Sequence, residues 1–164
     1  MSLLAIAALA GGARADGDKT FNSRVAYAPL VHKLEASGGD VGRILHPRSR
    51  DELAALAAGK RYKFVVTTDG KLAIAPLPAD AEHNEYVHPV LASGAAVLTA
   101  GGITVERRDG TITRVTLDED SKSYCPTLDS LAAAERALAR LGVPAASITR
   151  RSQPPRCEPV QGGR

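Results

Sequence analysis

The sequence is poor in aromatic residues and in cysteine. Its 164 residues include no Trp, two Phe, four Tyr and two Cys. With so few large rings, the core must be built mainly from Ala, Leu and Val. No apolar run approaches the ~18 residues of a membrane-spanning helix, so we expect no membrane span. The 15 Gly and 10 Pro follow no regular period, which excludes a collagen-like chain.

The composition that remains is typical of one globular domain. Hydrophobic residues make up 44% of the chain and charged residues 24%. A chain of about 150 residues buries roughly 68–70% of its unfolded surface, enough for a core without a metal or cofactor, and we expect neither. The net charge is +3, and basic residues are interleaved with acidic ones, so we expect no nucleic-acid partner.

The first 15 residues resemble a secretory signal peptide. An apolar stretch over 3–10 precedes the small-residue site Ala13-Arg14-Ala15. No Lys or Arg comes before that stretch, and an Ala-rich helix packed on the domain is the alternative. We expect cleavage after Ala15, one domain over 16–150, a Pro- and Gly-rich tail over 151–164, and a secreted or periplasmic location.

Cys125 and Cys157 are the two cysteines of the chain. An even number of cysteines in an oxidising compartment favours a disulfide, with free thiols as the alternative. The bond needs Cα atoms within about 4.4–6.8 Å, so it requires the chain after Gly142 to run back along the preceding helix. A metal site is disfavoured, because no CxxC spacing is present and the four His are dispersed.

Hydrophobic periodicity predicts helices near both ends of the chain. The first expected helix covers 28–36 and the last covers 129–141, capped by Thr127 or Asp129. Between them, Ser49 and Glu52 form a capping box. The helix that this box starts is expected to bury Leu53, Leu56 and Ala57 and to end at Gly59.

Period-two patterns predict strands in the middle of the chain. The segments 62–67 and 72–74 flank the turn Asp69-Gly70, and 97–108 and 111–117 flank Asp109-Gly110. An edge strand near 146–150 is a further candidate. Helices at both ends with hairpins between them predict the α+β class: a single domain with a mainly antiparallel twisted sheet and flanking helices. The acidic residues Asp118, Glu119 and Asp120 are interpreted as a solvated turn.

Three segments form a more specific pattern. They are His88-Pro-Val-Leu-Ala-Ser-Gly94, Ala100-Gly101 and Ser121-Lys-Ser-Tyr-Cys-Pro-Thr127. The pattern, over about residues 60–143, resembles the Ser-Gly-His-Tyr-x-Pro signature domain of plant IQ-motif (IQM) proteins and of related uncharacterised bacterial and fungal proteins. The Gly-His of that signature is Lys122-Ser123 here. No IQ-type helix is present, so the resemblance implies no calmodulin binding.

The candidate binding residues are His88, Ser121, Ser123 and Tyr124. Structural roles are the alternative: His88 at a helical turn, Ser121 in a turn, and Tyr124 in the core with its hydroxyl bonded to the backbone. No catalytic residue is assigned, because the chain contains no phosphate loop, nucleophile elbow or zincin helix. A serine in place of the signature histidine cannot shuttle a proton near neutral pH.

Two classes of function follow from these observations. The favoured one is a small bacterial, secreted or periplasmic, non-enzymatic binding or structural module of uncharacterised activity, whose partner is unknown and could be a protein. The alternative is an exported effector or toxin-like enzyme with a polar pocket centred on His88. An enzyme of that kind would bring His88 within hydrogen-bond reach of Ser121, Ser123 or Tyr124.

Overall fold

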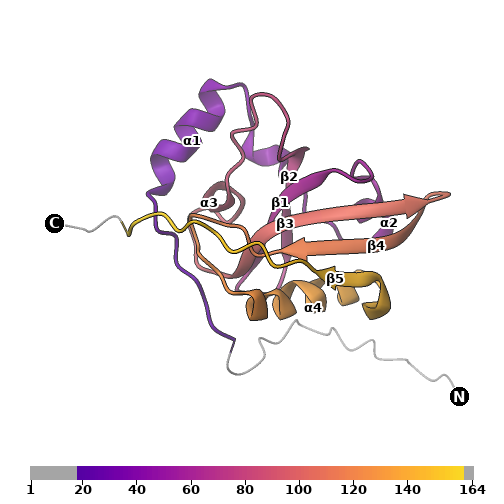
Figure 1. Ribbon diagram of the computed structural model, residues 1–164. Helices are drawn as coiled ribbons and strands as arrows, with labels where there is room; N and C mark the ends of the chain where they lie inside the picture. Colours follow the sequence, from indigo (N-terminus) through magenta and orange to yellow (C-terminus); the bar gives the residue numbers. More distant parts are fainter. Residues whose placement is uncertain (1–17, 161–164) are drawn as a thin grey trace, which may run out of the picture.

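A five-stranded sheet with the order β2-β1-β3-β4-β5 forms the centre of the protein (Figure 1). Its strands are β1 (Arg61–Thr67), β2 (Leu72–Pro78), β3 (Val97–Arg108), β4 (Thr111–Asp118) and β5 (Ile148–Arg150). All neighbouring strands are antiparallel except β4 and β5, which are parallel. The computed structural model describes residues 18–160, so the predicted signal peptide over 1–15 lies outside the described residues.

Helices cover both faces of this sheet. They are α1 (Tyr27–Ala36), α2 (Arg50–Ala54), α3 (His88–Leu91) and α4 (Ala132–Arg140), together with the 3₁₀ turns η1 (Val41–Arg43), η2 (Leu128–Leu131) and η3 (Ala145–Ser147). In Figure 1, α1 and α3 lie on the opposite side of the sheet from α4. The predicted single α+β domain is therefore confirmed. None of the helices within residues 18–160 is long and apolar enough to cross a membrane.

The alternation of side chains along the strands creates two hydrophobic cores. Phe64 and Val66 of β1 belong to the core that also contains residues of α2 and α4. Val65, between them, belongs to the core on the other face, with Leu34 of α1 and residues of α3. Neighbouring side chains of a strand point to opposite faces, so a sheet covered on both faces gives the nearly continuous apolar run of β1.

The boundaries of α2 and β2 differ from the prediction. The helix after Ser49 ends at Ala54, and Ala57 is exposed. Ser49 Oγ accepts from the Glu52 amide as predicted, but the Glu52 carboxylate accepts from the Arg48 amide instead of the Ser49 amide. β2 extends to Pro78. Proline has no backbone N–H to donate to a neighbouring strand, and this is tolerated because β2 lies at the edge of the sheet.

The last predicted helix is divided in two. Residues 128–131 form the 3₁₀ turn η2, and α4 follows directly from Ala132. Neither Thr127 nor Asp129 caps it with a side chain. The N-cap residue of η2 is Thr127, whose hydroxyl makes no cap bond, and the Thr127 carbonyl instead accepts from Ser130 Oγ.

Cys125 and Cys157 form the predicted disulfide, with Cα atoms 5.4 Å apart. After α4 the chain forms β5 beside β4 and then runs back towards the start of the helix, as the yellow segment of Figure 1 shows. The Glu158 amide donates to the Lys122 carbonyl at 3.0 Å next to the bridge. The topology that the disulfide required is therefore present.

Candidate functional site

A cleft of about 390 Å³ lies between the start of α1, β1, α3 and the C-terminal segment. One part of its lining is apolar and consists of Val25, Leu30 and Val87. The polar part contains His88 and Ser123, with Arg61, Lys63, Asp120, Lys122 and Glu158 as its charged members. Small-molecule sites in proteins combine apolar walls with a few polar groups in this way.

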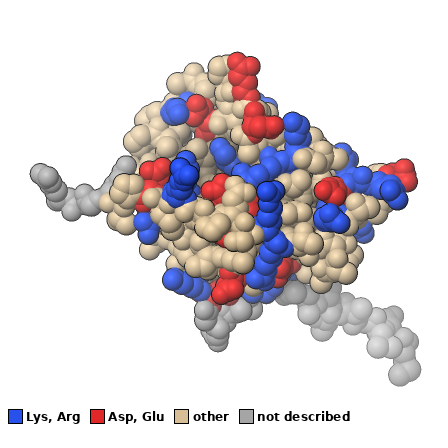
Figure 2. All heavy atoms as spheres, viewed as in Figure 1, with Lys and Arg blue, Asp and Glu red and all other residues tan. Residues whose placement is uncertain are grey.

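Basic side chains do not form a continuous surface on the face of the protein that Figure 2 shows. Figure 2 shows Lys and Arg side chains interspersed with Asp and Glu over the face in view. A nucleic-acid interface requires a continuous basic face or stripe. The lining of the cleft is of mixed charge as well, since Asp120 and Glu158 lie among its basic residues.

His88 lies at the first position of α3, and its side chain is buried. Its Nε2 is 2.9 Å from the Gly101 carbonyl oxygen, so the neutral ring donates Nε2–H to that carbonyl. Burial lowers the pKa of His88 to about 4, and the nearby charges of Lys63 and Arg61 act in the same direction. The imidazole is therefore neutral at physiological pH.

The other three candidate binding residues do not converge on His88. Tyr124 is buried and donates its hydroxyl to the Ala95 carbonyl at 2.7 Å. Ser121 is also buried, and its Oγ has no hydrogen-bond partner among the described residues. Ser123 lines the cleft with His88, whereas Ser121 and Tyr124 do not. Within residues 18–160, none of the three forms a hydrogen bond with His88.

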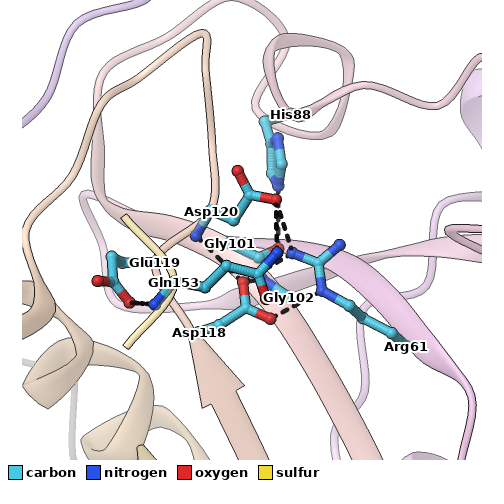
Figure 3. Close-up of polar contacts among 8 residues, drawn as sticks. All are labelled: Arg61, His88, Gly101, Gly102, Asp118, Glu119, Asp120 and Gln153. Carbon is cyan, nitrogen blue, oxygen red and sulfur yellow. Dashed lines mark hydrogen bonds and ion pairs between the residues drawn. The ribbon is translucent and has the colours of Figure 1, made fainter. Parts of the chain in front are cut away.

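A polar network that the sequence did not reveal lies beside His88 (Figure 3). Arg61 Nε donates to Asp118 Oδ2 and Arg61 Nη2 to Asp118 Oδ1, both at 2.7 Å. Asp118 Oδ1 also accepts from the Gly102 and Asp120 amides, at 2.9 and 3.1 Å. Burial opposes ionisation of Asp118, but Arg61 and the amide donors outweigh it and hold the pKa of the carboxyl below its usual value.

The interpretation of residues 118–120 as a solvated turn is wrong. Asp118 is 6% exposed and Glu119 3% exposed. Glu119 accepts from the Gln153 amide at 3.1 Å and from Ser152 Oγ at 3.3 Å, and Gln153 Nε2 donates to Asp120 Oδ2 at 3.2 Å. These acids therefore bind partners that are distant in sequence, and through them they hold the C-terminal segment against the sheet.

Gly101 and Gly102 make room for this network. A Cβ atom at Gly101 would overlap the Asp118 carbonyl, and one at Gly102 would overlap the Arg61 guanidinium and the Asp118 carboxylate. Glycine inside a strand often marks a close approach of this kind. The pair of glycines within β3 was the signal in the sequence that pointed to this place.

Lys63 is the partly buried cation of the cleft that has no ion pair among the described residues. Burial lowers the pKa of Lys63, and the charges of Arg61 and Lys33 lower it further, against the opposing effect of Glu85. The Glu85 carboxylate lies 2.8 Å from Lys33 Nζ, and Asp118 is held by Arg61. Glu85 and Asp118 are thus already paired with other cations.

Neither metal ligation nor likeness to a known protein assigns a role to this site. No cluster of His, Cys, Asp and Glu within residues 18–160 has the arrangement of a metal site. Comparison with known proteins finds no matching family model, no matching curated protein and no matching solved structure. The functional argument therefore depends on the geometry of the cleft.

Proposed function

We propose that the protein is an exported, disulfide-bonded, non-enzymatic binding module whose ligand occupies the cleft beside His88 and Ser123. The main support is the state of His88. Its Nε2–H is engaged by a backbone carbonyl at 2.9 Å, and a base with a pKa of about 4 has little driving force to take a proton at neutral pH. Of the three residues that could have acted with it, Ser121 and Tyr124 do not line the cleft, and Ser123 forms no hydrogen bond with His88 in the described part of the chain.

The resemblance to the IQM signature domain agrees with this proposal, because it implies no enzymatic activity for this chain. The histidine of that signature corresponds to Ser123, which lacks the proton chemistry of an imidazole near neutral pH. A ligand held by Ser123 and the surrounding charges would be bound without being converted.

Export is the second part of the proposal. It is supported by the disulfide between Cys125 and Cys157, since such bonds persist in oxidising compartments, and by the resemblance of residues 1–15 to a signal peptide. N-terminal sequencing of the protein from a periplasmic or extracellular fraction tests it. We expect the mature chain to begin at Asp16, and a chain that retains Met1 or Ser2 contradicts this part of the proposal.

Binding at the cleft is tested by NMR titration of the wild-type protein with a panel of small acids, amines and sugars. We expect at least one compound to shift the amide signals of Lys63, Val87 and Ser123 and to be recovered unchanged. Leu30→Trp narrows the cleft and should weaken that binding. Leu128→Trp, at an exposed position outside the cleft, is the matched control.

Two results contradict the proposal. Shifts confined to residues outside the cleft show that the site is elsewhere. If the wild-type protein converts a panel compound, and His88→Gln abolishes the conversion while retaining the fold, the result favours the alternative of an exported effector enzyme.

A further inference from the structure

Lys63 is a partly buried residue of β1 that lines the cleft. It lies on β1 two residues after Arg61, so both side chains are on the same face of the strand. Its partner across β3 is Gly102, which has no side chain. The space over Gly102 is filled by the Arg61 guanidinium and the Asp118 carboxylate, and Lys63 lines the cleft beside this ion pair.

The charges around Lys63 leave its ammonium group uncompensated. Arg61 is held by Asp118 at 2.7 Å and lies 3.6 Å from Asp120, and Lys33 pairs with Glu85 at 2.8 Å. Lys63 itself is partly buried and has no carboxylate within ion-pair distance in the described chain. A partly desolvated cation without a counterion is costly, and an anion from outside relieves that cost.

The remaining lining limits which anion fits. Val25, Leu30 and Val87 offer an apolar wall, which inorganic anions do not use. Asp120 and Glu158 are also in the lining, and they disfavour ligands with several negative charges. The cavity of about 390 Å³ has the size of a site for a small organic molecule.

We propose that the cleft binds a small organic monoanion, such as a carboxylate, whose charged group is received by Lys63 and whose apolar chain lies against Leu30 and Val87. This inference rests on the proposed function, because it specifies the ligand class of the same site. It assigns Lys63 a binding role that no sequence pattern indicated.

The test compares four probes by NMR titration: hexanoate, hexanol, hexylammonium and inorganic phosphate. We expect hexanoate to shift the amide signals of Lys63, Val87 and Ser123 at the lowest concentration.

The variant Lys63→Met keeps the length of the side chain and removes the charge. We expect it to weaken hexanoate binding at least about tenfold, which corresponds to the loss of one hydrogen bond to a charged group. Lys71→Met is the matched control, because Lys71 is exposed and pairs with Asp69 on the β1–β2 turn. Chemical denaturation of each variant establishes that the fold is retained.

Each other outcome overturns a defined part of the inference. If hexanol binds as tightly as hexanoate and Lys63→Met has no effect, the cleft is a binding site but not one for anions. If inorganic phosphate binds as tightly as hexanoate, the apolar wall plays no part. If none of the four probes shifts the cleft residues, the monoanion class is wrong, and the wider panel decides separately whether the cleft binds anything.

Discussion

Arg61 and Asp118 form a bidentate ion pair over Gly102, with both N···O distances at 2.7 Å. Arg61 lies on β1 and Asp118 at the end of β4, and β3 separates the two strands. The pair therefore links two strands that share no backbone hydrogen bonds. It also fixes Arg61 in the lining of the cleft, beside Lys63.

We expect Asp118→Asn to destabilise the protein by about 2–3 kcal/mol. Breaking a buried pair by removing one charge typically costs about 3–5 kcal/mol, and the value is smaller here because the Arg61 side chain is 30% exposed. Chemical denaturation at pH 7 measures the change. Asp80→Asn is the control, since its pair with Lys60 is exposed and should contribute nothing measurable. A loss for Asp118→Asn no larger than that of the control contradicts the prediction.

The fold was largely predictable from local patterns. The strand Val97–Arg108 begins and ends where its period-two pattern does, and Gly70 and Gly110 adopt the positive φ that the predicted turns need. These features depend on neighbours in the sequence. Helix ends were predicted less well: the short helix α2 ends at Ala54, before Leu56 packs into the core, and does not continue to the Gly59 stop signal.

The site was much less predictable, because its contacts join distant segments. Three acids in a row suggest a solvated turn, and nothing nearby in the sequence indicates Arg61, 57 residues before Asp118. Ser121, Ser123 and Tyr124 are close in sequence, yet only Ser123 of these lines the cleft. Lys63 was not recognised because a lone lysine in a strand becomes informative only when its counterions are known.

The stability of the protein should fall in mild acid because of His88. The pKa of His88 is about 4 in the folded protein, against 6.5 for the free side chain. Between these values the unfolded chain takes up a proton and the folded chain does not, so stability decreases as the pH falls from about 6.5 to about 4 and not further below. Lys63 and Arg61 disfavour the charged ring, and Asp118 favours it.

His88→Gln isolates this effect. The glutamine amide can still donate to the Gly101 carbonyl but does not titrate in this range. Between pH 7 and pH 4.5 we expect the wild-type protein to lose about 2–3 kcal/mol more than the variant, as measured by urea denaturation. Equal losses for both proteins indicate an imidazole that protonates freely in the fold, which contradicts the buried, neutral state.

Leu138→Ala should be strongly destabilising. Leu138 is fully buried in the core beneath α4, and truncation of such a leucine costs about 2–5 kcal/mol. Leu128→Ala is the control, because Leu128 is 36% exposed on η2 and surface truncations usually change stability by less than about 0.5 kcal/mol. Similar losses in the two variants at equilibrium denaturation indicate that α4 does not pack on the sheet through Leu138.

The disulfide is expected to stabilise the fold and to close one side of the cleft. Its two cysteines are 32 residues apart, and on the chain-entropy model a loop of this length contributes about 3–4 kcal/mol. Peptide mapping without reduction should recover the Cys125–Cys157 link. Two alkylatable thiols in protein purified from an oxidising compartment contradict it.

The double variant Cys125→Ser/Cys157→Ser separates the role of the bridge from that of the polar contacts of the tail. Gln153 and Ser152 remain bonded to Glu119, whereas Glu158, which lines the cleft, is next to the bridge. We expect hydrogen exchange to rise at the amide of Glu158, which donates to Lys122, and to change little at Gln153 and in α4. Wild-type protein under reducing conditions should show the same pattern. Unchanged exchange at Glu158 means that the cleft wall is held without the disulfide, and a rise that extends to Gln153 means that the contacts with Glu119 depend on it.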